Sequence, residues 1–333
     1  MNVSRQVGRK GVFWFAVATV LFLALVYLAD LDKFLGSIRA ADPRFFAVAL
    51  GVGFSSLLVW AWVWHRFFGQ MGMETTVSRT LRMFMTGHFL NSITPLGQFG
   101  GEPVMAYIVS DNTGTDYERS LACVVSADLI NAVPFFTFTL GGVVYLALRG
   151  ALTGFLADVG AAAVVLLLAA SLVAYLLWSD DATLSGAVVA AVDAVERRVD
   201  RGEGFFESIR ERVRNIESSF QEAGSDRRFL VTTALGSHLA ILAQIVSLYF
   251  VLLSLGLEPA FVPLYFIVNL SVIATVSPTP GGSGTYEAAF SGLVTVFYAV
   301  DLSVALTAAV LFRLTTYWPG LLVGYASMLT LRD

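Results

Sequence analysis

The chain has little charge and few of the side chains on which most catalytic sites depend. Only 14% of its 333 residues are charged, and it has three histidines and one cysteine. Cys123 therefore excludes an intrachain disulfide, and its apolar surroundings are typical of a small buried side chain. There is no His-Glu-x-x-His pair, no Gly-x-Ser-x-Gly elbow and no cluster of metal ligands. We expect no metal, no other cofactor and no catalytic residue of these classes.

Two further absences narrow the function. The sequence has no Gly-Lys-Ser/Thr phosphate-binding loop, which excludes transport that this chain itself drives with ATP. The net charge is −4 and the basic residues form no patch for nucleic acid, so we expect no nucleic-acid partner.

Apolar residues are abundant, at 56% of the chain. This share is too high for a soluble domain and predicts an all-α polytopic membrane protein. Because about 20 apolar residues cross a bilayer as a helix, we expect about six transmembrane helices. They lie at 12–29, 45–64, 120–147, 157–178, 229–255 and 303–330.

Two other apolar segments, 80–110 and 262–300, are broken by proline and glycine in the same pattern. Thr94-Pro95-Leu96-Gly97 leads to Glu102, and Thr279-Pro280-Gly281-Gly282 leads to Glu287. The arms beside each break are short for a membrane about 30 Å thick, since a helix rises about 1.5 Å per residue. The pattern therefore predicts two re-entrant helical hairpins.

The placement of Lys and Arg predicts the orientation. Most of them fall on the side of the N-terminus, even when a polar insert at 179–228 is left out. We expect a cell (cytoplasmic) membrane protein with both termini in the cytoplasm. The two hairpins then enter from opposite faces, which is the inverted-repeat arrangement of many secondary transporters.

The insert at 179–228 is the only long polar stretch. Apolar residues recur there every three or four positions in two runs, which predicts two amphipathic helices. The insert either packs on the membrane domain or binds a partner or a lipid surface. The expected division is an N-terminal membrane half at 1–178 with the first hairpin, the cytoplasmic insert, and a C-terminal half at 229–333 with the second hairpin.

Unwound backbone in lipid persists only where protein buries it or where it lines a wet cavity. Glu102 and Glu287 begin the half-helices after the breaks, and each either caps its helix or acts as a proton, cation or headgroup site. Arg313 lies inside the last helix and needs a partner. That partner is Glu287, Asp128 or a phosphate-bearing headgroup that fits the guanidinium.

The candidate substrate-binding residues lie at the two breaks or on helix faces expected to surround them. They are Asn91, Thr94, Gly97, Gly100, Gly101, Glu102, Asp128, Asn131, Thr279, Gly281, Gly282, Gly284, Tyr286, Glu287 and Arg313. Asp128 and Asn131 share a helix face and either bind substrate or bond to the hairpins. His88 and Asn91 are expected to help satisfy the first hairpin, whereas His238 and Gln244 favour bonds between helices.

These residues resemble a flippase-like integral membrane family, the transmembrane region of lysylphosphatidylglycerol synthases. The similarity covers nearly the whole chain and rests on residues 91–103, residues 278–287, and Arg313 with Trp318-Pro319-Gly320. It implies a stand-alone archaeal or bacterial member that moves or exposes a lipid. The implied partner is an aminoacylated phospholipid or a polyprenyl-phosphate-linked sugar. Because the chain stops at Asp333, just past the last helix, lipid aminoacylation is not expected.

Two other functions remain open from the residues. One is an intramembrane enzyme that acts on lipid phosphates or lipid-linked sugars through Glu102, Asp128 and His88. The other is a non-transporting scaffold of a cell-envelope glycosylation pathway, recruited through residues 179–228.

Overall fold

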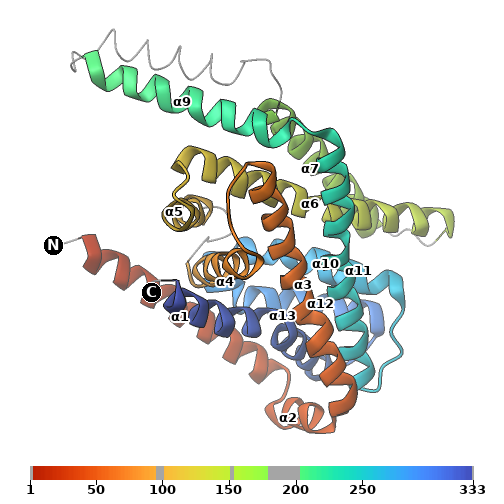
Figure 1. Cartoon of the computed structure of the whole chain (residues 1–333). Coiled ribbons are helices and arrows are strands. Elements are labelled where there is room, and N and C mark those ends of the chain that lie inside the picture. Colours follow the sequence, from red (N-terminus) through yellow and green to blue (C-terminus); the bar gives the residue numbers. More distant parts are fainter. Residues whose placement is uncertain (1–2, 95–100, 151–153, 179–202, 332–333) are drawn as a thin grey trace. The chain divides into compact units, whose positions relative to one another are not determined.

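The computed structural model describes residues 3–94, 101–150, 154–178 and 203–331, and these are helical apart from short connections (Figure 1). Five of the described helices are long and apolar enough to cross a membrane. They are α3 (Pro43–Gln70), α6 (Tyr117–Leu148), α7 (Gly154–Trp178), α10 (Arg227–Ser254) and α13 (Leu302–Thr330). A sixth candidate span is the pair α1 (Val3–Leu28) and α2 (Leu31–Ala40), which is bent by 86°. The predicted all-α polytopic membrane fold is confirmed.

Helix α2 was not predicted from the sequence. It begins after Asp30, whose carboxylate accepts hydrogen bonds from the backbone of Asp32 and Lys33 and so caps the helix. Phe34 is buried against Val26 and Leu306. The segment is short and weakly apolar, so this packing and the Asp30 cap stabilise it as a helix.

The second predicted break is present, and the described helices flank the first. In the first segment α4 (Val77–Ile93) ends before the break and α5 (Glu102–Thr113) follows it. The intervening residues 95–100, which include the predicted site residues Gly97 and Gly100, lie outside the described residues. In the second segment α11 (Phe261–Ile273), the short turns η2 (Ala274–Val276) and η3 (Pro280–Gly282), and α12 (Thr285–Tyr298) follow one another. That the hairpins enter from opposite faces stays a prediction.

The described contacts divide the chain into two compact units. The first consists of Met1–Ala61, Arg82–Gly101 and Leu239–Asp333, and the second of Trp62–Leu81 and Glu102–His238. Three boundaries of these units fall within α3, α4 and α10, at positions that no sequence pattern marks, and the fourth falls between Gly101 and Glu102, where the first Pro/Gly pattern leads into α5. The predicted division at residues 179 and 228 stays a prediction.

The first unit holds the second broken segment in an aromatic and small-residue core. Phe266 of α11 stacks on Phe297 of α12 with ring centroids 6.1 Å apart, and Phe290 of α12 stacks on Phe312 of α13 at 5.4 Å. Ser247 of α10 donates to the Ala49 carbonyl of α3 at 2.8 Å. These contacts fix the helices that surround the candidate site.

The second unit contains the described part of the insert, α9 (Glu203–Gly224). Its apolar side faces the protein, since Phe220 is buried, and Arg119 of α6 forms an ion pair with Glu222. A second pair joins Arg212 to Glu118 at 3.7 Å. This half of the insert is thus a helix that packs on α6, and its cytoplasmic location stays a prediction. The other predicted helix falls in residues 179–202, outside the described residues.

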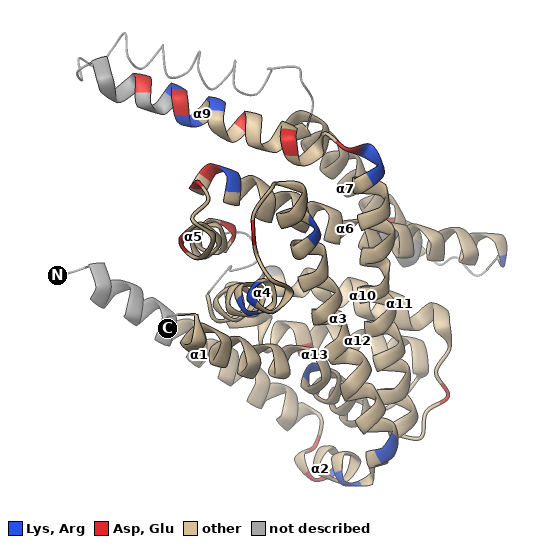
Figure 2. Cartoon of the chain, in the orientation of Figure 1, with Lys and Arg blue, Asp and Glu red and all other residues tan. Residues whose placement is uncertain are grey.

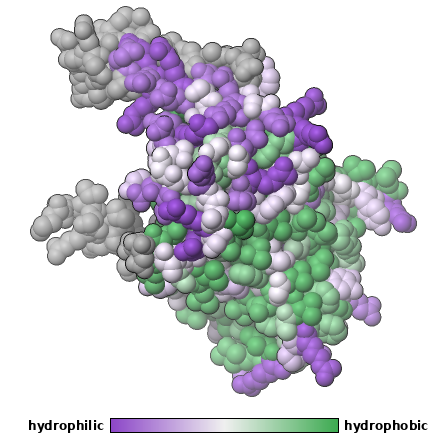
Figure 3. Space-filling view, viewed as in Figure 1, coloured by the Kyte–Doolittle hydropathy of each residue, from purple (hydrophilic) through white to green (hydrophobic). Residues whose placement is uncertain are grey.

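Charge and hydropathy separate along the elements. Lys, Arg, Asp and Glu gather on α9 and near helix ends, while the long helices are mostly free of them (Figure 2). The visible face is purple over α9 and largely green over the spanning helices (Figure 3). This pattern suits helices surrounded by lipid and one amphipathic helix in a polar environment.

Candidate functional site

The second break folds tightly because glycine occupies each position with a left-handed backbone. Gly281, Gly282 and Gly284 have φ values of 56°, 65° and 87°. A Cβ atom on Gly282 would lie 2.7 Å from the Cα of Thr275. Real Cβ atoms essentially never lie that close to another heavy atom. Glycine is therefore required for η3 to fold against η2.

Glu287, the third residue of α12, makes two hydrogen bonds with its carboxylate. One oxygen accepts from the backbone N–H of Gly284 at 2.6 Å, which caps the helix. The other accepts from Nη1 of Arg313 at 2.7 Å. The two residues are only 6% and 5% exposed. The sequence left capping by Glu287 and pairing with Arg313 as separate possibilities, and the structure contains both.

Arg313 joins three elements of the first unit. Beyond its pair with Glu287, its Nη2 donates to the carbonyl of Gly281 in η3 at 2.7 Å. Its guanidinium carbon lies 3.8 Å from the ring centroid of Tyr317 and 5.0 Å from that of Tyr286. Two aromatic faces and a carboxylate therefore stabilise a cation that would otherwise be costly inside a membrane span.

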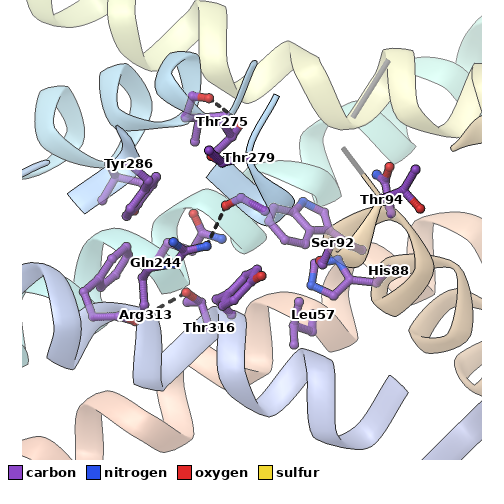
Figure 4. A pocket seen from close by; sticks show the side chains of 17 residues that line it. Leu57, His88, Ser92, Thr94, Gln244, Thr275, Thr279, Tyr286, Arg313 and Thr316 are labelled. Carbon is purple, nitrogen blue, oxygen red and sulfur yellow. Dashed lines mark hydrogen bonds between the residues drawn. The ribbon is translucent and has the colours of Figure 1, made fainter. Parts of the chain in front are cut away.

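Arg313 lies at the wall of a cavity of about 130 Å³ whose lining mixes polar and apolar side chains (Figure 4); we call it the polar cavity after its hydrogen-bonding residues. The cavity is built from α3, α4, α10, α11, α13 and the second break, all within the first unit. Its hydrogen-bonding lining is His88, Asn91, Ser92, Thr94, Gln244, Thr275, Thr279, Thr316 and Tyr317. Among the described lining residues Arg313 is the one with a formal charge.

Two polar atoms of this lining have no hydrogen-bond partner among the described residues. They are Nε2 of His88 and Oδ1 of Asn91, and both atoms are buried. The His88 ring is held by stacking on Phe84, with centroids 6.1 Å apart, and by close packing against Gly320. A buried unpaired polar atom costs about 1–3 kcal/mol, which a hydrogen-bonding ligand would recover.

A second, mostly apolar cavity of about 740 Å³ lies in the same unit. Its apolar lining is Phe15, Ala18, Phe22, Val310, Trp318 and Leu321, from α1 and α13. Arg313 and Glu287 lie at its wall as well. Ser92, Arg313 and Tyr317 line both cavities, so the ion pair stands where a polar space meets an apolar one.

With this geometry described, comparison with known proteins identifies the family. Residues 13–324 match the lysylphosphatidylglycerol synthase TM region. The chain belongs to this family. Similar curated proteins are archaeal members named UPF0104 membrane proteins. One from Pyrococcus horikoshii is 25% identical over 316 residues, which cover 92% of this chain and 93% of the relative.

Another UPF0104 membrane protein, from Methanothermobacter thermautotrophicus, is 23% identical over 96% of this chain and 95% of its own length. One from Methanocaldococcus jannaschii is 21% identical over 97% and 95%. The match to the family over nearly the whole chain confirms the resemblance seen in the sequence and an integral multi-pass membrane protein.

Several of the predicted site residues lie in the first unit and line the polar cavity. Asn91, Thr94, Thr279, Gly281, Tyr286 and Arg313 line it. Gly282 and Gly284 shape the turn behind it, Glu287 holds Arg313, and Gly101 is buried.

The remaining described candidates belong to the second unit. Glu102 is the first residue of α5 and is half-buried. Asp128 of α6 accepts a hydrogen bond from the indole of Trp64 at 3.4 Å. Oδ1 of Asn131 is buried without a partner among the described residues. His238 bonds to Thr137 of α6 at 2.8 Å, which confirms the predicted bond between helices.

Sequence reasoning did not place Trp60, Gln244, Thr275, Thr316 or Tyr317 at the site. Tyr317 carried a signal, because it lies four residues after Arg313 and so shares its helix face. Gln244 was expected to bond between helices, which stays a prediction, and it lines the cavity. For the others no local pattern distinguishes a residue that lines a cavity from one that packs in a core.

Proposed function

We propose that this protein is a lipid transporter, not an enzyme, that moves or exposes a phosphate-bearing lipid between the leaflets of the cell membrane. The observation that carries the proposal is the buried Arg313 at the wall of a polar cavity inside membrane-spanning helices. Such an intramembrane cation marks a functional site by default, because it is costly to keep. The headgroup occupies the polar cavity, and both termini lie in the cytoplasm.

Arg313 has donors to spare for a phosphate. A guanidinium carries five N–H groups, and the bonds to Glu287 and Gly281 use two of them. The Glu287 carboxylate offsets the charge of the arginine. A phosphate is therefore held by directed hydrogen bonds rather than by a strong net charge, which allows its release.

The rest of the lining favours an uncharged, hydroxyl-rich headgroup over an aminoacylated one. Asn91, Gln244 and the hydroxyl side chains both donate and accept hydrogen bonds, as sugar hydroxyls require. A lysyl ammonium would need a carboxylate, and Glu287 is already engaged by Arg313. Of the two lipid classes that the sequence suggests, a sugar joined through phosphate to a polyprenyl chain therefore suits the cavity better.

The rival function, an intramembrane enzyme, has less support. It would use Glu102, Asp128 and His88. Among the described residues that line the polar cavity, His88 is the one member of this set. The scaffold alternative would use the insert, but the apolar side of α9 is already packed against α6. A partner bound to the charged side of α9 is compatible with transport.

Reconstitution in liposomes tests the proposal. The probes are phosphatidylglycerol, lysyl-phosphatidylglycerol and a hexose phosphate of an isoprenoid, with leaflet exchange followed by membrane-impermeant periodate or an amine reagent. The double variant Arg313→Met with Glu287→Gln removes both charges while keeping the volume, so it should fold. We expect exchange to fall about tenfold or more, because charged hydrogen bonds contribute about 1.5–3 kcal/mol each.

Exposed Arg149, which stacks on Tyr145 in the second unit, provides the matched control as Arg149→Met and should leave exchange unchanged. The proposal fails if no probe exchanges, or if the double variant exchanges at the parental rate. Covalently altered lipid would instead favour the enzyme. Faster exchange of lysyl-phosphatidylglycerol than of the hexose lipid would reverse the headgroup assignment.

A further inference from the structure

The apolar cavity beside Arg313 has no role in headgroup binding. It is several times larger than the polar cavity, at about 740 Å³ against about 130 Å³. Its walls are α1 on one side and α13 on the other, with the ends of α4 and η3 between them. Its polar lining residues are Thr19, Ser92, Ser283, Glu287, Arg313 and Tyr317.

Water is a poor occupant of this space. A buried water needs about two to four polar partners, and most of the described lining offers none. Phe15 and Trp318 line the cavity and are themselves 66% and 49% exposed, so the space opens between spanning helices rather than being sealed. In a membrane, such an opening admits hydrocarbon chains.

The shared wall connects this cavity to the headgroup site. Ser92, Arg313 and Tyr317 face both spaces. A molecule whose phosphate lies at Arg313 therefore has hydrogen-bonding groups on one side of the phosphate and an apolar space on the other. That order of polar head, phosphate and chain is the covalent order of a phosphate-linked lipid.

We propose that the apolar cavity binds the hydrocarbon chain of the transported lipid next to its phosphate, with α1 as the outer wall of the chain site. This inference rests on the proposed function. Bilayer lipid is as apolar as the cavity, so the gain on entry is small, but a phosphate bound at Arg313 places the adjoining chain in the cavity, and a filled cavity would therefore oppose binding of the whole lipid. The cavity instead keeps the chain beside the headgroup while the headgroup is bound.

A cavity-filling substitution on α1 tests the chain site. Thr19 lines the apolar cavity and is exposed, so Thr19→Trp occupies the space without crowding a buried core. Ala24 is also exposed on α1 but is not among the described residues that line the cavity. Ala24→Trp is therefore the matched control. The probes are a hexose phosphate of a long isoprenoid and the same headgroup on a short, water-soluble isoprenoid.

We expect Thr19→Trp to weaken binding of the long-chain probe in nanodiscs and slow its exchange about tenfold, as overfilling of a packed space does. The short-chain probe should bind within about twofold of the parent, which also reports an intact fold, and Ala24→Trp should change neither. The inference is overturned if both probes lose affinity alike, or if the two Trp variants behave alike. Because binding is measured separately, absent exchange in the parent would count against transport and not against the chain site.

Discussion

The two broken segments share a sequence pattern, and their carboxylates differ in burial. Glu287 is the third residue of α12, is 6% exposed, and bonds to both Gly284 and Arg313. Glu102 is the first residue of α5 and is half-buried. The spacing from proline thus places an acid in the first helical turn in both cases. Whether that acid becomes half of a buried ion pair depends on a cation from a distant helix.

The largest difference should appear when each acid is removed. Glu287→Ala leaves a buried arginine without its partner, so the free energy of unfolding should fall by about 3–5 kcal/mol. Glu102→Ala should cost about 1 kcal/mol or less, the value of a favourable charge at a helix start. Titration with SDS in mixed micelles, followed by circular dichroism, measures both.

Restoring neutrality provides the control for this comparison. Arg313→Met together with Glu287→Gln should recover most of the stability lost in Glu287→Ala. Equal losses for Glu287→Ala and Glu102→Ala would show that the ion pair is not what distinguishes the two breaks.

A smaller difference is expected between two glycines with positive φ, Gly282 in the second segment and Gly114 just after the first. Gly282→Ala should lower the free energy of unfolding by about 2–4 kcal/mol, because it adds a clash with Thr275 to the backbone penalty. Gly114 follows α5 with φ of 69° and open space around it, so Gly114→Ala should cost about 1 kcal/mol. The same SDS titration ranks them, and a larger loss at Gly114 would contradict the packed geometry of the second break.

The smallest difference concerns the threonines that begin the two patterns. Thr279 is buried and its hydroxyl bonds to that of Ser277, so Thr279→Val should cost about 1 kcal/mol. Thr94 is exposed, lies just after α4, and donates to the Leu90 carbonyl of that helix, so Thr94→Val should cost under about 0.5 kcal/mol. Indistinguishable midpoints in the titration would mean that the buried hydroxyl pair adds nothing.

The sequence predicted the elements well and the site in part. The spanning helices, both breaks and the amphipathic α9 follow from local hydropathy and from proline and glycine. Arg313 stood out because a cation inside an apolar helix needs a partner, and Glu287 was among those expected. Helix α2, however, depends on Phe34 packing against Leu306, a contact across most of the chain length.

The site as a whole likewise combines features that follow from local sequence with contacts between distant residues. Composition and periodicity by themselves determined a helical membrane protein with two interrupted segments, because those properties depend on neighbouring residues along the chain. Only the tertiary structure decided that Arg313, Glu287 and Gly281 share one network. It also decided that Gln244 faces a cavity, and that a polar and an apolar space meet at Ser92 and Tyr317. Those outcomes depend on which helix faces meet, and hydrophobic side chains on every face of a membrane helix leave that choice unmarked in the sequence.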